Sequence, residues 1–121
     1  SFGVGQGTHV SLSPFDMHNT LVAAGPHFKA GIVSTLPSGN VDVAPTILWL
    51  LGIKPAKRMD GRVLSEALSV PGPELKSYRP QRLEAKVQLE GFEWRQYLNC
   101  VEVNGVEYFD EGNGAQIKAS P

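Results

Sequence analysis

Charged residues are distributed unevenly along this chain of 121 residues. Only Asp16, Lys29 and Asp42 are charged among the first 53 residues, whereas the remaining 68 carry the other twenty charges. Because ionised side chains are rarely buried, a long segment with so few of them is typical of protein interior. The first half therefore predicts buried elements, and the second half predicts elements with one face in water.

The length and composition predict a single domain over residues 1–121. A folded chain of 13.1 kDa exposes roughly 6,400 Å², against roughly 19,000 Å² when unfolded, so about two-thirds of its surface can be buried. Apolar residues make up 41% and charged residues 19% of the chain, which is far from the composition of a disordered protein. We expect one hydrophobic core.

Charge and hydropathy exclude two classes of partner. The net charge is −1 and the isoelectric point is near 6.3, so the chain lacks the basic character that binds nucleic acid. The longest strongly apolar run, residues 47–53, is much shorter than the roughly 20 residues that cross a bilayer. We expect neither nucleic acid nor a membrane as a partner.

The first half contains two short apolar runs that predict buried strands. Residues 20–24 are bounded by Gly25 and Pro26, and residues 31–36 are followed by a Pro-Ser-Gly turn. Neither run alternates in polarity, which is typical of strands covered on both faces. We therefore expect residues 20–24 and 31–36 to lie inside a sheet.

From residue 40 the pattern changes to that of a helix. Pro45 falls in the first turn, where its missing N–H costs little, and Gly52 follows as a stop signal. Asn40 or Asp42 is the candidate N-cap. The apolar residues that share one side of this helix are Val43, Ile47, Leu50 and Leu51. Residues 63–68 predict a short element that is either helix or strand.

The last third predicts β-structure. Residues 82–90 alternate between apolar and charged or polar side chains, as expected for a strand with one face in water. Residues 94–103 and 106–109 flank Asn104-Gly105, the dipeptide that best tolerates a type I′ turn, and predict a hairpin. The aromatic residues of this region are expected to hold the sheet together.

These elements give an α+β fold. We expect one or two helices packed on a small mixed sheet, with an antiparallel hairpin at the C-terminal end. Residues 1–68 form the loop, strand and helix segment, and residues 80–118 form the hairpin region.

Few residues have the setting that chemistry requires. His9 lies in a loop of small residues, where an accessible imidazole is a candidate metal ligand. His18 follows Asp16 by two residues, and its simplest interpretation is a hydrogen-bonded loop histidine; His27 is expected on the surface. Cys100 is the only cysteine of the sequence, which excludes an intrachain disulfide and a multi-thiolate zinc site. Its place within a strand predicts a buried structural thiol.

A resemblance to a known family covers nearly the whole chain, most specifically its first 65 residues. The matching segments are residues 7–31, which read GTHVSLSPFDMHNTLVAAGPHFKAG, residues 37–53 and residues 59–64, followed by residues 108–114. These segments resemble the last catalytic block and the tail of the alkaline phosphatase superfamily. The chain is most similar to its sulfatase-like and type I phosphodiesterase/nucleotide pyrophosphatase branches.

The resemblance implies that the chain is a C-terminal fragment of an alkaline-phosphatase-like α/β fold. Members of that family hydrolyse sulfuric or phosphoric esters. The family's catalytic metal is a divalent ion, zinc or calcium, and His9 matches a late histidine ligand of the phosphodiesterase branch. The family's nucleophile has no match here, because Cys100 is not in the sulfatase context. Since a catalytic zinc takes about three protein ligands, His9 alone is expected neither to bind a metal tightly nor to support catalysis.

Three hypotheses follow. The leading one is the C-terminal segment of a sulfatase-like or phosphodiesterase-like metallohydrolase, catalytically incomplete as an isolated chain. The second is a freestanding, non-catalytic assembly or binding module derived from that segment, for example a mobile-element gene product. The third is a small metal-binding protein that uses His9, Asp16 and His18. For the first, we expect as partners either further copies of the chain or the missing upstream part of the parent chain.

Overall fold

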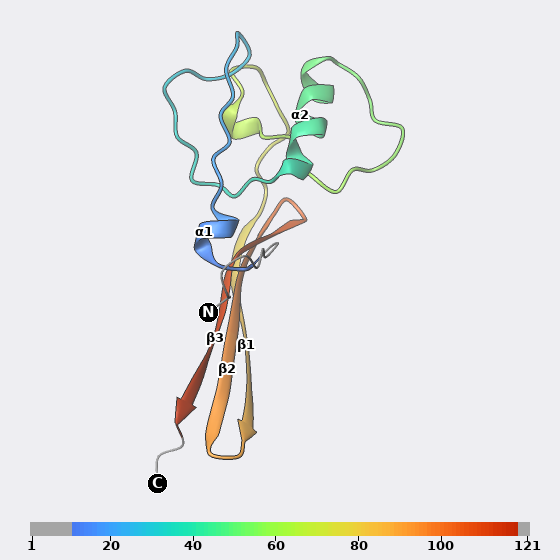
Figure 1. The fold of residues 1–121 in the computed structure, drawn as a ribbon. Coiled ribbons are helices and arrows are strands. Elements are labelled where there is room, and N and C mark those ends of the chain that lie inside the picture. The colour runs from blue at the N-terminus through green and yellow to red at the C-terminus, as the bar shows by residue number, and fades with distance from the viewer. Residues whose placement is uncertain (1–10, 119–121) are drawn as a thin grey trace, which may run out of the picture.

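The computed structural model describes residues 11–118, which form two parts (Figure 1). Residues 19–77 form a head made mostly of loops, and residues 78–118 form a long three-stranded sheet, which we call the arm. The helical elements are α1 (Pro14–Met17), the 3-10 turn η1 (Asn40–Asp42), α2 (Val43–Leu50) and the 3-10 turn η2 (Ser65–Ala67). The strands are β1 (Tyr78–Leu89), β2 (Phe92–Val103) and β3 (Val106–Lys118).

The α+β class is confirmed, but the prediction of a mixed sheet is wrong for the described residues. The sheet is antiparallel throughout, in the order β1-β2-β3. The predicted hairpin is confirmed at Asn104-Gly105, whose φ angles of 52° and 80° are those of a type I′ turn. A second two-residue turn, Glu90-Gly91, joins β1 to β2, so two tight turns build the whole arm.

A β-bulge interrupts the pairing of β2 with β3. Asn99 pairs with Glu111 and Cys100 pairs with Phe109, so Asp110 has no partner in the ladder. Bulges redirect side chains, and Oδ1 of Asp110 accepts a hydrogen bond from Nε2 of His18, with 2.7 Å between the two atoms. The bulge thereby ties the residues that follow α1 to the arm.

The two strands predicted in the first half are not strands. Residues 20–24 and 31–36 run through the head as open chain, and neither is hydrogen-bonded to a neighbouring strand in the described part of the structure. Val22 and Val33 are 81% and 93% exposed. A strand exists only when another strand satisfies its backbone groups, and residues 11–118 provide no such partner for these segments.

The predicted helix is confirmed as α2, and the chain leaves it through Gly52, whose φ is +67°. Asp42 immediately precedes α2, although its carboxylate is used elsewhere. The predicted packing of α2 on the sheet is wrong, because α2 lies in the head beside η1 while the short α1 contacts β3 (Figure 1). Residues 63–68 contain η2 rather than a full helix or a strand.

The chain buries less surface than its mass predicts. Its accessible surface is 9546 Å², about half again the roughly 6,400 Å² of a typical folded monomer of this size. Every residue of β1 is exposed, and so are Ile47 and Leu51 on the apolar side of α2. No helix within residues 11–118 is long and apolar enough to cross a membrane.

Candidate functional site

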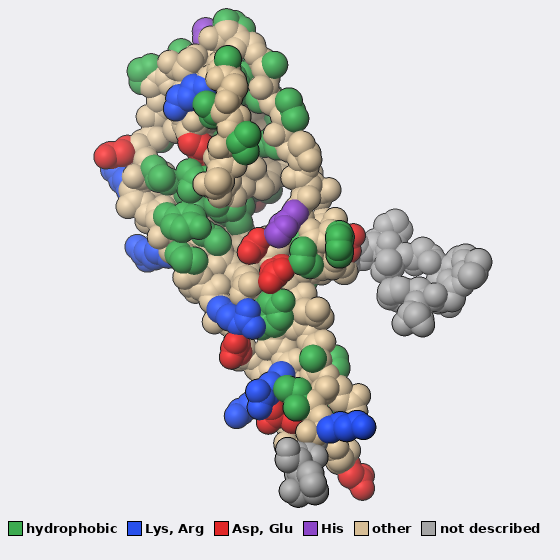
Figure 2. Space-filling model, turned by 90° about the vertical axis from the view of Figure 1, so that its left-hand side faces the viewer, with side chains coloured by type: hydrophobic (Ala, Val, Ile, Leu, Met, Phe, Trp, Pro, Cys, Tyr) green, Lys and Arg blue, Asp and Glu red, His purple; other side chains and the backbone are tan. Residues whose placement is uncertain are grey.

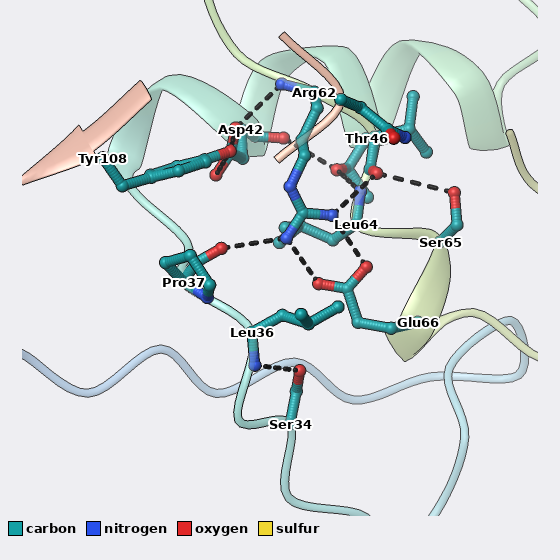
Figure 3. Close-up of polar contacts among 12 residues, drawn as sticks. Ser34, Leu36, Pro37, Asp42, Thr46, Arg62, Leu64, Ser65, Glu66 and Tyr108 are labelled. Carbon is teal, nitrogen blue, oxygen red and sulfur yellow. Dashed lines mark hydrogen bonds and ion pairs between the residues drawn. The ribbon is translucent and has the colours of Figure 1, made fainter. Parts of the chain in front are cut away.

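A cluster of polar side chains is buried where the head meets the arm (Figure 3). We call it the buried cluster, and its members are Asp42, Thr46, Arg62, Glu66 and Tyr108. Asp42 ends η1, Thr46 lies in the first turn of α2, and Tyr108 comes from β3 across the interface. The cluster is therefore built from segments up to 66 residues apart in sequence.

Asp42 is the centre of the buried cluster and is fully buried, with 0% of its surface exposed. Its Oδ1 accepts hydrogen bonds from the backbone N–H of Arg62 at 2.8 Å and from the Tyr108 hydroxyl at 2.9 Å. Its Oδ2 accepts from the backbone N–H of Gly39 at 2.8 Å and lies 3.0 Å from the same hydroxyl. Burial and the adjacent Asp42 carboxylate raise the pKa of Tyr108 well above its ordinary value.

Arg62 and Glu66 form the second half of the buried cluster. The guanidinium donates to both carboxylate oxygens of Glu66, at 2.8 and 2.7 Å, and to the carbonyl of Pro37 at 2.9 Å. Burial opposes the charged form of both groups, but their hydrogen bonds and mutual attraction outweigh it. The pKa of Arg62 is consequently raised and that of Glu66 is lowered.

Thr46 and Gly61 bring the backbone segments of the cluster together. The Thr46 hydroxyl donates to the carbonyl of Asp42 at 2.7 Å and accepts from the N–H of Leu64 at 3.0 Å. At Gly61 a Cβ would lie only 2.1 Å from the carbonyl oxygen of Val41. Only glycine permits this approach, and the approach places the Arg62 N–H against Asp42.

The buried cluster does not have the chemistry of a catalytic centre. A general base needs a free lone pair directed at a substrate, whereas both Asp42 oxygens already accept hydrogen bonds inside the protein. The Arg62 charge is balanced by Glu66 in a two-bond pair. The arrangement fixes the head on the arm, and it therefore sets the shape of the surface beside it.

That surface is a large hollow beside the buried cluster, with a volume of about 1030 Å³. Its walls include Leu21, Val22 and Ile32 from the open segments of the head, and Val101 and Phe109 from the arm. In Figure 2 apolar side chains gather on the head, and acidic side chains lie below them, towards the arm. The hollow thus has both apolar and polar walls, the latter including Lys29, Glu66 and Asp110, and is bordered by unpaired chain.

Of the predicted site residues, the structure describes Asp16, His18 and His27. His9 lies outside the described residues. His18 is a hydrogen-bonded loop histidine, as predicted, and its partner is Asp110, while the Asp16 carboxylate accepts a hydrogen bond from the hydroxyl of Ser11. His27 is exposed, as predicted.

Metal-binding and thiol chemistry have little support within residues 11–118. No three His, Cys, Asp or Glu side chains come together there in a way that could hold a metal ion. Cys100 is buried in β2, as predicted, with 1% of its surface exposed. Burial, followed by the neighbouring Glu107, raises the pKa of its thiol and keeps it protonated.

Sequence reasoning missed most of the buried cluster. Asp42 is conspicuous in the sequence as one of three charges in an apolar half, but its position before a helical pattern predicts only a helix cap. Arg62 and Glu66 are separated by four residues, which is compatible with an ion pair, yet nothing in the sequence places Tyr108 beside Asp42. Their contact depends on how β3 meets the head.

Comparisons with known proteins give no relative for this chain: no protein-family model, no curated protein and no solved structure matches it.

Proposed function

We propose that this chain is the C-terminal segment of a metallohydrolase of the alkaline phosphatase superfamily, in its sulfatase-like or phosphodiesterase-like branch. As an isolated chain it is catalytically incomplete, and in the parent it supplies His9 and the closing part of the fold. The proposal includes the ester hydrolase activity of the parent, which requires a nucleophile and further metal ligands from upstream residues.

The observation that carries this proposal is the state of residues 20–24 and 31–36. Both have the composition of doubly covered strands, and both lie unpaired along the hollow. Apolar chain with an unpaired backbone is unfavourable in water, because it leaves both the side chains and the peptide groups without partners. Strands from an upstream part of a larger sheet would satisfy both requirements.

The divalent metal of the parent family, zinc or calcium, does not fit the described residues by themselves. The nearest candidates are already engaged, since His18 is bonded to Asp110 and Asp16 to Ser11. A catalytic zinc needs about three protein ligands and one open position. We therefore derive no catalytic step through a metal for this chain.

The reading frame upstream of the Ser1 codon tests the proposal. A continuous frame of several hundred codons that encodes a Ser, Thr or Cys nucleophile and an Asp-His pair is the expected result. A start codon directly upstream would contradict it. The expected activity of the isolated chain toward aryl sulfates and bis-aryl phosphates, with zinc or calcium added, is zero; turnover that persists through repurification and is lost in His9→Ala would overturn the proposed incompleteness.

The second candidate function is a non-catalytic assembly module. One observation favours it: the arm is regular, projects from the head, and has an exposed edge strand in β1 (Figure 1). A start codon directly upstream of Ser1 would support this candidate.

A further inference from the structure

We propose that β1 is a self-association edge, along which two copies of this chain pair antiparallel about a twofold axis at Ala85. The inference names a partner, a second copy, and it does not depend on the metallohydrolase assignment. The partner surface, residues 82–88 of β1, does not line the hollow, so its failure would leave the proposed function untouched.

The backbone of β1 presents a free ladder. Glu90-Gly91 is a two-residue turn closed by the pair Leu89 and Phe92, and the closing pair of such a turn is hydrogen-bonded. Odd-numbered residues of β1 therefore bond to β2, and even-numbered residues direct their N–H and C=O groups outward. Within the described residues no strand pairs with that outer side.

The one proline of β1 agrees with this assignment. Pro80 has an even number, so the N–H it lacks would have pointed away from β2. Proline at an edge prevents pairing locally, but Pro80 lies near the start of a 12-residue strand. Residues 82–88 remain open for pairing with another chain.

The side chains of β1 restrict which register is possible. Leu83, Ala85, Val87 and Leu89 occupy one face, and the charged residues Arg82, Glu84 and Lys86 occupy the other. A register that matched odd with even residues would place apolar side chains beside charged ones, and is excluded. The twofold axis must therefore pass through a residue rather than between two residues.

Charge then selects among the remaining registers. An axis at Arg82, Glu84 or Lys86 would set a charged residue against its own copy, which is destabilising. An axis at Leu83 places Arg82 opposite Glu84 of the second copy, but it also brings Pro80 into the ladder. Because Pro80 has no N–H, one hydrogen bond is lost at each end of the paired segment. An axis at Ala85 keeps Pro80 out and forms four hydrogen-bonded pairs from residues 82, 84, 86 and 88, whereas an axis at Val87 forms only two, from residues 86 and 88, because β1 ends at Leu89.

The Ala85 register also gives Lys86 a counterion. On the charged face Lys86 lies directly opposite Arg95 of β2, a like-charge pair, and within residues 11–118 it has no ion-pair partner. In the proposed dimer Glu84 of the second copy lies on the other side of Lys86. On the apolar face Leu83 lies beside Val87 of the second copy, and both are about half exposed in the single chain.

Cysteine cross-linking tests the register directly. In a non-hydrogen-bonded antiparallel pair the two Cα atoms are about 4.5 Å apart, within the range that a disulfide spans. Ala85→Cys should form a disulfide-linked dimer under mild oxidation about tenfold faster than Gln96→Cys, which shares its face but lies on the central strand. The wild-type chain controls for Cys100.

The outcomes separate the alternatives. For an axis at Ala85, we expect Leu83→Cys to cross-link slowly by itself. A mixture of Leu83→Cys and Val87→Cys should cross-link efficiently. Fastest cross-linking of Leu83→Cys by itself would overturn this register. Cross-linking of Ala85→Cys no faster than that of Gln96→Cys would overturn the edge proposal.

A charge exchange provides a second test that needs no new thiol. In Lys86→Glu the new glutamate of each copy lies opposite Glu84 of the other copy. The dissociation constant of the dimer, measured by analytical ultracentrifugation, should rise by about tenfold. The double variant Glu84→Lys/Lys86→Glu restores opposite charges and should recover the dimer. A monomeric wild-type chain at high concentration, or a dimer insensitive to Lys86→Glu, would contradict the proposal.

Discussion

The head and the arm of this protein are held together in different ways. The arm is a regular antiparallel sheet whose two tight turns bring neighbouring strands together, so its structure depends on contacts that are close in sequence. The head has one helix of eight residues, and its loops are held by the buried cluster, whose contacts are distant in sequence. A sheet built from local turns forms with little help, whereas loops fixed by one polar cluster depend on each of its members.

The head and the arm also differ in how much of their backbone lacks a neighbouring strand. The arm satisfies its backbone through its own ladder and leaves only its edges open. The head leaves whole segments, residues 20–24 and 31–36, without a neighbouring strand. The backbone of the central strand of the arm thus has neighbours on both sides, whereas these two segments of the head have none among residues 11–118, and our proposal is that upstream strands supply them.

Removal of Asp42 should have the largest effect and should separate the two parts. Asp42→Ala leaves the N–H groups of Gly39 and Arg62 and the Tyr108 hydroxyl without their acceptor, at a cost of about 3–5 kcal/mol. We expect the NMR signals of the head to lose their chemical-shift dispersion, while those of β2 and its turns keep theirs. Asp60→Ala removes an exposed acid from the neighbouring loop and should change neither; loss of the arm together with the head would show that the two parts fold as one unit.

Substitution at Gly61 should disrupt the head through backbone contact alone. Gly61→Ala places a Cβ 2.1 Å from the Val41 carbonyl oxygen, and the resulting shift should cost about 1–3 kcal/mol in urea unfolding. Gly39→Ala is the matched control, because its Cβ would lie at ordinary contact distance from two side chains, 3.7 Å from Val41 and 4.0 Å from Tyr108. Equal effects of the two substitutions would contradict the close approach at Gly61.

Substitution at Asn104 should weaken the arm by a smaller amount. The Asn104 side chain accepts from the N–H of Lys76 at 2.7 Å and donates to the carbonyl of Glu74 at 2.9 Å, and its φ is +52°. Asn104→Ala loses both contacts and strains the turn, which should cost about 1–2 kcal/mol. Asn104→Gly keeps the turn conformation and should lose less stability; a larger loss for the glycine variant would disprove the role of the positive φ.

Acid should lower the stability of the head before that of the arm, and this is the smallest of the expected effects. The pKa of Glu66 is lowered from the ordinary value of 4.5 by its pairing with Arg62, after opposition from burial. A lowered folded-state pKa gives stability that is present above the unfolded value and is lost as the pH falls through the folded value. Unfolding free energies measured from neutral pH to below 4.5 should fall in the wild type and fall less in Glu66→Gln. Glu90→Gln, an exposed control in the turn between β1 and β2, should follow the wild type.

The sequence predicted the arm better than the head for a physical reason. Alternation in residues 82–90 and the Asn104-Gly105 dipeptide are local signals, and local turns bring the three strands together. The runs at 20–24 and 31–36 carry an equally clear strand composition, but a strand also needs a partner, which composition does not supply. Asp42 was visible as a rare charge, whereas its contact with Tyr108 depends on tertiary structure.

Amide hydrogen exchange distinguishes a paired backbone in the arm from an unpaired one in the head. We expect strong protection for the amides of β2, which is bonded on both sides, and exchange near the rate of unfolded chain for residues 20–24 and 31–36. Protection of those two segments comparable to that of β2 would contradict this expectation, because it would show that the head already provides them with partners.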